Sequence, residues 1–263
     1  MNPVPPVIRI CLDPDIGAES TSNMHRREVI FVADDFGLNA DINRATVHAH
    51  SHGALQGASL MMGQRATDDA ARMARDNPSL QIGWHLHLCD SQPVTCDAWP
   101  WGNAYAHAGW SIGLSRRAWH LMRNEVAAQW DLFQATGLPC AFVNSHHHLH
   151  AHPFVYAALL EILPKEFNGW LRLGKPRFFG PMKNQYFYIC ADELFMQSRR
   201  RQCPHRCSDT IWGLGRTYRM HTAEVVEAAQ QLPDGLHEFY FHPRAIENDT
   251  DVRCLLELKS CGF

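Results

Sequence analysis

Several features that define large classes of protein are missing from this sequence of 263 residues. No apolar run approaches the ~18–20 residues that a membrane-spanning helix needs. The first apolar run, Pro3 to Leu12, is broken by prolines and by Arg9 and does not resemble a signal peptide. The formal net charge is −3, so no excess of positive charge is available to attract nucleic acid. We therefore expect no transmembrane segment and no nucleic-acid partner.

Paired CxxC motifs are also missing. The nine cysteines are an odd number and are scattered along the chain, which is typical of a reducing compartment rather than of a disulfide-bonded secreted protein. Cys203, His205 and Cys207 resemble half of a zinc knuckle, but no second pair completes it. We predict a cytoplasmic protein, and we leave open both peripheral association with a membrane and a homodimer.

The composition that is present is that of a folded chain. Hydrophobic residues make up 46% and charged residues 19%, enough to bury a sizeable core. Apolar β-branched runs alternate with helical patterns, which favours a parallel sheet, and the length fits a β/α barrel. We predict an α/β fold, an irregular TIM-like (β/α) barrel of about seven parallel strands. It forms a single domain over residues 28–263, preceded by a flexible N-terminal tail, residues 1–27.

The expected elements follow from periodicity and from capping residues. The predicted strands are residues 28–33, 54–62, 80–88, 140–143, 170–173, 210–212 and 235–242, and the predicted helices are residues 39–53, 64–75, 115–136, 153–163, 187–201 and 222–232. Residues 89–113 have no period, which predicts a long loop that acts as a lid or binding surface. Its aromatic residues Trp99, Trp101, Tyr105 and Trp110 either cover a ligand or pack over the barrel mouth.

Polar side chains gather where four of the predicted strands end. They are Asp34-Asp35, His85 with His87, the run from Asn144 to His150, and His242. The carboxyl ends of parallel strands meet at one edge, where barrels carry their chemistry.

The run from Asn144 onwards is the densest of these groups, with five histidines between positions 146 and 152. On an extended backbone His146, His148 and His150 would share one side. The run is framed by a strand pattern and a helix pattern, so we interpret it as a metal or catalytic cluster rather than a polar loop or a purification tag.

These residue types suit metal-assisted hydrolysis. One carboxylate and two imidazoles from separate strands form a three-ligand set with open positions, the pattern of a catalytic metal site. A second carboxylate can act as general base, and a histidine across the site can protonate the leaving group. Adjacent acids alone could equally be a helix cap. His87 either chelates the ion together with His85 or lies deeper as a hydrogen-bonded core histidine, and we favour the second interpretation.

Three motifs resemble the signatures of the YdjC-like carbohydrate deacetylases, in order and in spacing, over about residues 28–243. They are Ala33–Leu38, Gly83–Leu88 and Asn144–His150, and Tyr240–Pro243 resembles the late His-Pro element of that family. The resemblance implies an irregular β/α barrel. It also implies a hydrolase that uses a divalent metal ion, magnesium or zinc, to remove acetyl groups from N-acetylglucosamine units.

Carried over by position, the resemblance implies that Asp35, His85 and His146 are the metal ligands. It makes Asp34 the catalytic base and His242 the catalytic acid. The sequence departs from the family pattern at two places. Many members have Asp at the position of Asn144, so a possible charge behind the ligands is absent here, and many have a small polar residue at the position of His87, next to the implied ligand His85.

Further segments resemble the branch of this family associated with hopanoid biosynthesis (HpnK-like). They are Ala58–Gly63, Asp90–Val94, Val143-Asn144 and Leu232–Gly235. This resemblance implies an N-acetylglucosaminyl hopanoid, a glycolipid, as the substrate. Two other hypotheses remain: a barrel metallohydrolase that cleaves a phosphoester or cyclic amide with His85 and His87 both bound to the ion, or a non-catalytic sugar- or lipid-binding protein.

Overall fold

The computed structural model describes residues 27–179 and 186–263. The tail predicted over residues 1–27 falls outside the described residues, except for Arg27, which begins the first strand. None of the helices within the described ranges is both long and apolar enough to cross a bilayer.

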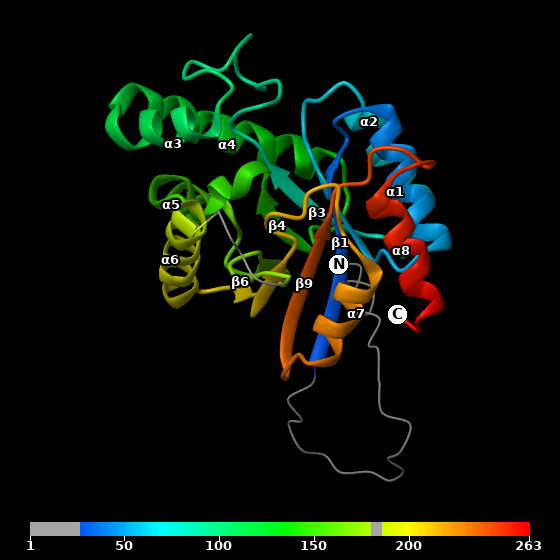
Figure 1. Ribbon diagram of the computed structural model, residues 1–263. Helices are drawn as coiled ribbons and strands as arrows, with labels where there is room; N and C mark the ends of the chain where they lie inside the picture. Colours follow the sequence, from blue (N-terminus) through cyan, green and yellow to red (C-terminus); the bar gives the residue numbers. More distant parts are fainter. Residues whose placement is uncertain (1–26, 180–185) are drawn as a thin grey trace.

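Strands and helices alternate along most of the chain (Figure 1). The strands are β1 (Arg27–Phe36), β2 (Gly57–Leu60), β3 (Gln81–Leu86), β4 (Phe142–Ser145), β5 (Trp170–Leu171), β6 (Lys175–Arg177), β7 (Arg206–Cys207), β8 (Thr210–Trp212) and β9 (Gly235–Phe241). The helices are α1 (Ala40–His52), α2 (Thr67–Asp76), α3 (Tyr105–Leu114), α4 (Arg116–Ala135), α5 (Pro153–Ile162), α6 (Tyr186–Gln202), α7 (Thr222–Gln230) and α8 (Thr250–Ser260), with a 3₁₀ turn, η1 (His146–Ala151).

The strands form one parallel sheet in the order β6-β8-β9-β1-β2-β3-β4-β5-β7. The sheet curls, because β7 pairs with β5 while β8, two residues further on, pairs with β9. Ser208 N accordingly donates to Leu171 O (3.1 Å) and Asp209 N to Leu236 O (2.7 Å). The prediction of a single parallel α/β domain is confirmed, but the predicted number of about seven strands is wrong, because the described residues form nine. β5 to β8 have only two or three residues each, too few for a periodic pattern.

The predicted loop over residues 89–113 is only partly a loop, because α3 begins at Tyr105. Ala108 and Ile112, four residues apart, are buried on its inner side and supply the helical signal that the aromatic content obscured. Trp99 and Trp101 are also buried. Their rings stack at 5.6 Å, and their indole N–H groups donate to Ser91 O and Leu88 O. These two tryptophans pack, whereas Tyr105 and Trp110 remain exposed.

Candidate active site

The carboxyl ends of the strands surround a pocket of about 280 Å³. Asp34 and Asp35 reach it from the end of β1, His85 from β3, His146 from the turn after β4, and His242 from the residue after β9. All five residues predicted from the sequence therefore line one pocket. The parallel pairing explains this, since β9, β1, β2, β3 and β4 are successive neighbours in the sheet.

Two neighbouring residues of a regular strand point to opposite faces, yet Asp34 and Asp35 both line the pocket. The pairing of β1 with β2 changes register between Ala33 and Phe36, and Asp35 has a left-handed backbone with φ of 65°. Such an irregularity re-aims a side chain. A left-handed backbone at a residue other than glycine has a cost, which is commonly retained at functional sites.

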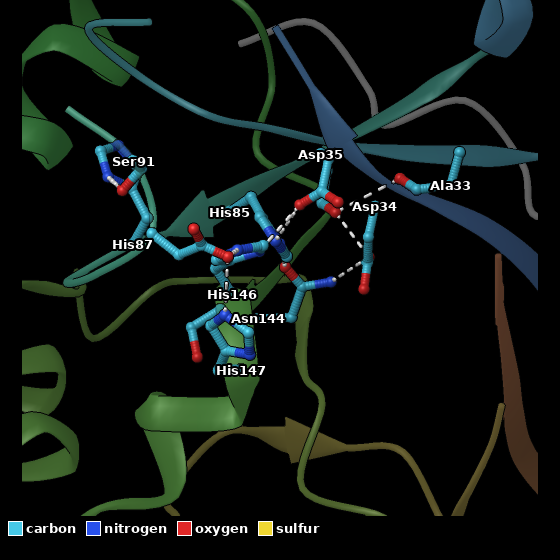
Figure 2. A network of polar contacts seen from close by, with 12 residues as sticks. Ala33, Asp34, Asp35, His85, His87, Ser91, Asn144, His146 and His147 are labelled. Carbon is cyan, nitrogen blue, oxygen red and sulfur yellow. Dashed lines mark hydrogen bonds and ion pairs between the residues drawn. The ribbon is translucent and has the colours of Figure 1, made fainter. Parts of the chain in front are cut away.

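Asp35, His85 and His146 converge on one point, as Figure 2 shows. Asp35 Oδ1 lies 2.9 Å from His146 Nδ1 and 3.3 Å from His85 Nε2. Asp35 Oδ1 and His85 Nε2 are nevertheless buried without a hydrogen-bond partner of acceptable geometry among the described residues. Buried polar atoms normally have partners, so these atoms fit a divalent cation. Asn144 Oδ1 lies 2.6 Å from His85 Nδ1 and orients the ring, as groups behind metal-bound histidines do.

The turn that carries the histidine cluster differs from the prediction. β4 ends at Ser145, and His147 and His148 have left-handed backbone angles, so the faces do not alternate as they would on an extended strand. His146 faces Asp35, whereas His150 is buried, with Ser145 Oγ at 2.7 Å from Nδ1 and Arg172 O at 2.6 Å from Nε2. His150 therefore supports the turn.

His87 points away from the candidate ligand group, which consists of Asp35, His85 and His146 (Figure 2). It is fully buried, and both ring nitrogens are engaged: Nδ1 lies 2.9 Å from Ser91 Oγ and Nε2 lies 2.8 Å from Met62 O. Burial lowers the pKa of His87 to about 3, so the ring is neutral. These contacts favour the core-histidine interpretation over chelation together with His85.

Asp34 takes part in a buried ionic network that the sequence did not predict. The Arg172 guanidinium donates to both of its oxygens, at 2.5 and 2.8 Å, and also to Glu238 Oε1 at 2.8 Å from Nε. Ser59 Oγ and Asn144 Nδ2 donate to Asp34 Oδ1 at 2.8 and 3.2 Å. A signal was available: Arg172 and Glu238 each lie within an apolar strand pattern, and a buried charge requires a partner.

The charges fix the ionisation of both aspartates. Burial alone would raise the pKa of Asp34, but the Arg172 guanidinium outweighs it and holds that pKa below its usual range. Burial likewise opposes ionisation of Asp35, and the charge of His146 holds its pKa well below the usual value. Burial would lower the pKa of His146, but Asp35 raises it. Both carboxylates are therefore ionised at neutral pH.

The His242 ring lines the pocket next to two tyrosines. Its ring centroid is 5.7 Å from those of Tyr218 and Tyr240. Its backbone N–H donates to Asp251 Oδ2 at 2.8 Å, and its Nδ1 is buried without a hydrogen-bond partner among the described residues. A second group, Asp90, His146 and His147, lies at the pocket mouth, with His147 Nε2 at 3.4 Å from Asp90 Oδ2.

Comparison with known proteins supports the same family as the motifs do. A profile of the family described as YdjC-like protein matches residues 28–257. A carbohydrate deacetylase of Vibrio campbellii is 34% identical over 128 residues, 48% of this chain and 51% of the relative. One of Vibrio parahaemolyticus is 32% identical over 182 residues, 65% of this chain and 67% of the relative. The chain thus spans about half the length of the first of these curated relatives.

A solved structure from Enterococcus faecalis V583, of a protein proposed to cleave cellobiose phosphate, shares the fold. The TM-score is 0.63 at 18% sequence identity, over 89% of this chain and 93% of the other. At this identity the likeness concerns the fold alone. The match over residues 28–257, with the motifs gathered in one pocket, shows that the chain belongs to the YdjC-like protein family.

Proposed function

We propose that this chain is a metal-dependent hydrolase that removes the acetyl group from an N-acetylglucosamine unit. The observation that carries the proposal is the convergence of Asp35, His85 and His146, where two buried ligand atoms have no hydrogen-bond partner within the described part of the chain. Relatives named carbohydrate deacetylases, 32–34% identical, support the substrate class. We propose a glycosylated hopanoid as the finer substrate, on the branch motifs alone.

Asp35, His85 and His146 would hold the ion, and magnesium or zinc is the ion we propose. A divalent cation bound there supplies a Lewis acid that polarises the acetyl carbonyl and makes water a stronger nucleophile. With three protein ligands at the edge of the pocket, the set would leave room for water and substrate at an ion held there.

We assign Asp34 the role of general base. A carboxylate offers about four acceptor sites. Three donors already contact Oδ1, namely Ser59, Asn144 and Arg172, while among the described residues Oδ2 accepts only from Arg172. Oδ2 therefore keeps acceptor capacity for a proton from the attacking water. The bidentate pairing with Arg172 fixes the carboxylate, and general bases must be held in position.

His242 completes the reaction as general acid. When water adds to the acetyl carbon and the C–N bond breaks, the departing amine nitrogen needs a proton. His242 lines the pocket together with the two aspartates, and its ring Nδ1 has no hydrogen-bond partner in the part of the chain that the structure describes. The products would be acetate and the free amino sugar.

The test is release of acetate from a soluble N-acetylated chito-disaccharide and from an N-acetylglucosaminyl hopanoid. Each is assayed with metal-stripped protein and after zinc or magnesium is added back. We expect metal-dependent acetate. His146→Ala should lose both bound metal and turnover, whereas exposed His52→Ala on α1 should keep both.

The outcomes separate the parts of the proposal. Acetate from the disaccharide alone would keep the chemistry and discard the hopanoid. No acetate from either substrate by protein with bound metal would reject the deacetylase and favour another hydrolase or a binding protein.

A further inference from the structure

Helix α3 has an unusual surface for a helix exposed to water. None of its ten residues is Asp, Glu, Lys or Arg. Ala108 and Ile112 face inward and are buried, but Trp110 is 69% and Leu114 80% exposed. Trp110 and Leu114 are four residues apart and share one face. A surface helix normally carries charged or polar residues on its outer side, whereas the exposed residues of α3 include Trp110 and Leu114 besides His107.

The apolar surface extends to the start of α5. His152 Nε2 lies 3.7 Å from the position of a Cβ at Gly113, and its ring is 5.9 Å from that of Phe154, which is 42% exposed. His152 therefore joins α3 to Phe154. Trp110, Leu114 and Phe154 form what we call the α3 surface.

In the chain segment that contains α3, residues 98–124, every charged residue is positive, and the exposed Asp90 lies nearby, next to His147. Between Asp97 and Glu125 the sequence has no acidic residue but three arginines, of which Arg116 and Arg117 directly follow α3 and are exposed. These two begin α4, whose first turn has no acidic residue. Cations are unfavourable at a helix N-terminus, so helix stability does not explain them. They suit a negatively charged surface next to an apolar one.

The α3 surface also adjoins the pocket. Tyr105, at the start of α3, stacks on His147 with ring centroids 5.6 Å apart and planes 23° apart, and His147 lines the pocket. In Figure 1, α3 lies at the same end of the molecule as the tip of the β3 arrow, where the strand-end residues gather.

We propose that the α3 surface is a membrane-docking site that binds the interface of an anionic phospholipid bilayer. Trp110 and Leu114 enter the boundary between headgroups and acyl chains, as the apolar face of an interfacial helix does, and Arg116 and Arg117 contact the anionic headgroups. The contact places the pocket mouth beside the membrane. It deepens the glycolipid part of the proposed function, but docking itself does not depend on catalysis.

The experiment is cosedimentation of the full chain with sucrose-loaded vesicles of phosphatidylcholine, with and without phosphatidylglycerol. We expect binding that needs the anionic lipid and weakens with salt. Trp110→Gln with Leu114→Gln should weaken binding about tenfold or more. Arg116→Gln with Arg117→Gln should weaken it about fivefold per arginine.

Matched controls lie away from the α3 surface. Leu132→Gln, at an exposed leucine near the other end of α4, and Arg253→Gln with Lys259→Gln, at exposed cations of α8, should bind as the unchanged chain does. All variants should keep the unfolding midpoint within a few degrees and the same turnover of the soluble disaccharide.

Three results would overturn the proposal: no binding of the unchanged chain to anionic vesicles, equal loss of binding in the controls, or light scattering showing that the Trp110/Leu114 variant only separates a dimer. None of them bears on acetate release from the soluble substrate. Conversely, a chain that binds vesicles but releases no acetate would keep the docking site and reject the deacetylase.

Discussion

Asp34 and Asp35 are adjacent in sequence and in the pocket, but their surroundings differ. The Asp34 carboxylate accepts hydrogen bonds from Ser59, Asn144 and Arg172. Asp35 Oδ1 has two histidines nearby but, among the described residues, no hydrogen-bond partner of acceptable geometry. Leaving a buried carboxylate oxygen without a partner is costly. The difference indicates that one acid is held in place by the protein and that the other is kept open for a ligand.

His85 and His87, two residues apart, show the same contrast between a side chain with an unpartnered atom and one whose polar atoms all have partners. His87 is held by Ser91 and Met62 through both ring nitrogens. His85 is held by Asn144 on one side only, and its Nε2 is left facing Asp35. In both pairs, the residue with an unsatisfied atom belongs to the proposed ligand group, and the polar atoms of its neighbour have partners in the protein.

The largest expected effect is at the aspartates themselves. Asp35→Asn should lose bound metal and reduce turnover about 10³-fold or more, because the charged ligand is gone. Asp34→Asn should keep the metal and reduce turnover by about 10²- to 10⁴-fold, the usual contribution of a general base. Metal content and acetate release measure the two effects. Full turnover in either variant would contradict the role assigned to that residue.

Removing Arg172 tests whether the network behind Asp34 is structural. Arg172 is completely buried between Asp34 and Glu238. Arg172→Met should lower the free energy of unfolding by about 3–5 kcal/mol, because two buried carboxylates lose their cation. Urea denaturation measures this. The control, Arg123→Met, breaks an exposed pair with Glu161 and should cost at most about 1 kcal/mol. Equal effects in the two variants would contradict a structural network.

Acidification should lower the free energy of unfolding through the buried histidines but not through exposed ones. Burial lowers the pKa of His87 to about 3 and that of His150 to about 4, against an ordinary value of 6.5. Below pH 6.5 these histidines bind a proton in the unfolded chain but not in the folded one. The free energy of unfolding therefore falls by about 1.4 kcal/mol per pH unit for each ring, from pH 6.5 down to the pKa in the folded state, and is unaffected by them above pH 6.5. Urea denaturation of metal-free protein at pH 7, 6 and 5 measures the slope. His87→Gln should reduce it, whereas exposed His52→Gln should not.

Glu125 extends the comparison to a buried acid outside the pocket. Its carboxylate accepts from the backbone N–H groups of Val94 and Thr95 at 2.7 and 2.8 Å, and from Gln129 Nε2 at 2.7 Å. Glu125→Gln turns one acceptor into a donor and should cost about 1–3 kcal/mol of stability. Metal content should not change, which elemental analysis can check. Loss of metal would show that this region supports the ligand group.

Much of the site could be predicted because strand ends of a parallel sheet meet at one edge. Asp35, His85 and His146 are found together for that reason, and the pattern of apolar runs was enough to place them at strand ends. Arg172 was missed because its partners, Asp34 and Glu238, are 138 and 66 residues away in the chain. A local sequence pattern cannot predict a pairing over such separations.

The sequence by itself determined the alternation of strands and helices, the family motifs and the residue types that meet in the pocket. These depend on local periodicity and on composition. Tertiary structure decided which side chains of each motif face the pocket and which are held by hydrogen bonds in the interior. The register change in β1 turns both aspartates into the pocket, and the left-handed turn after β4 separates His146 from His148 and His150. Backbone irregularities and partners distant in the sequence determine these positions, and local periodicity predicts neither of them.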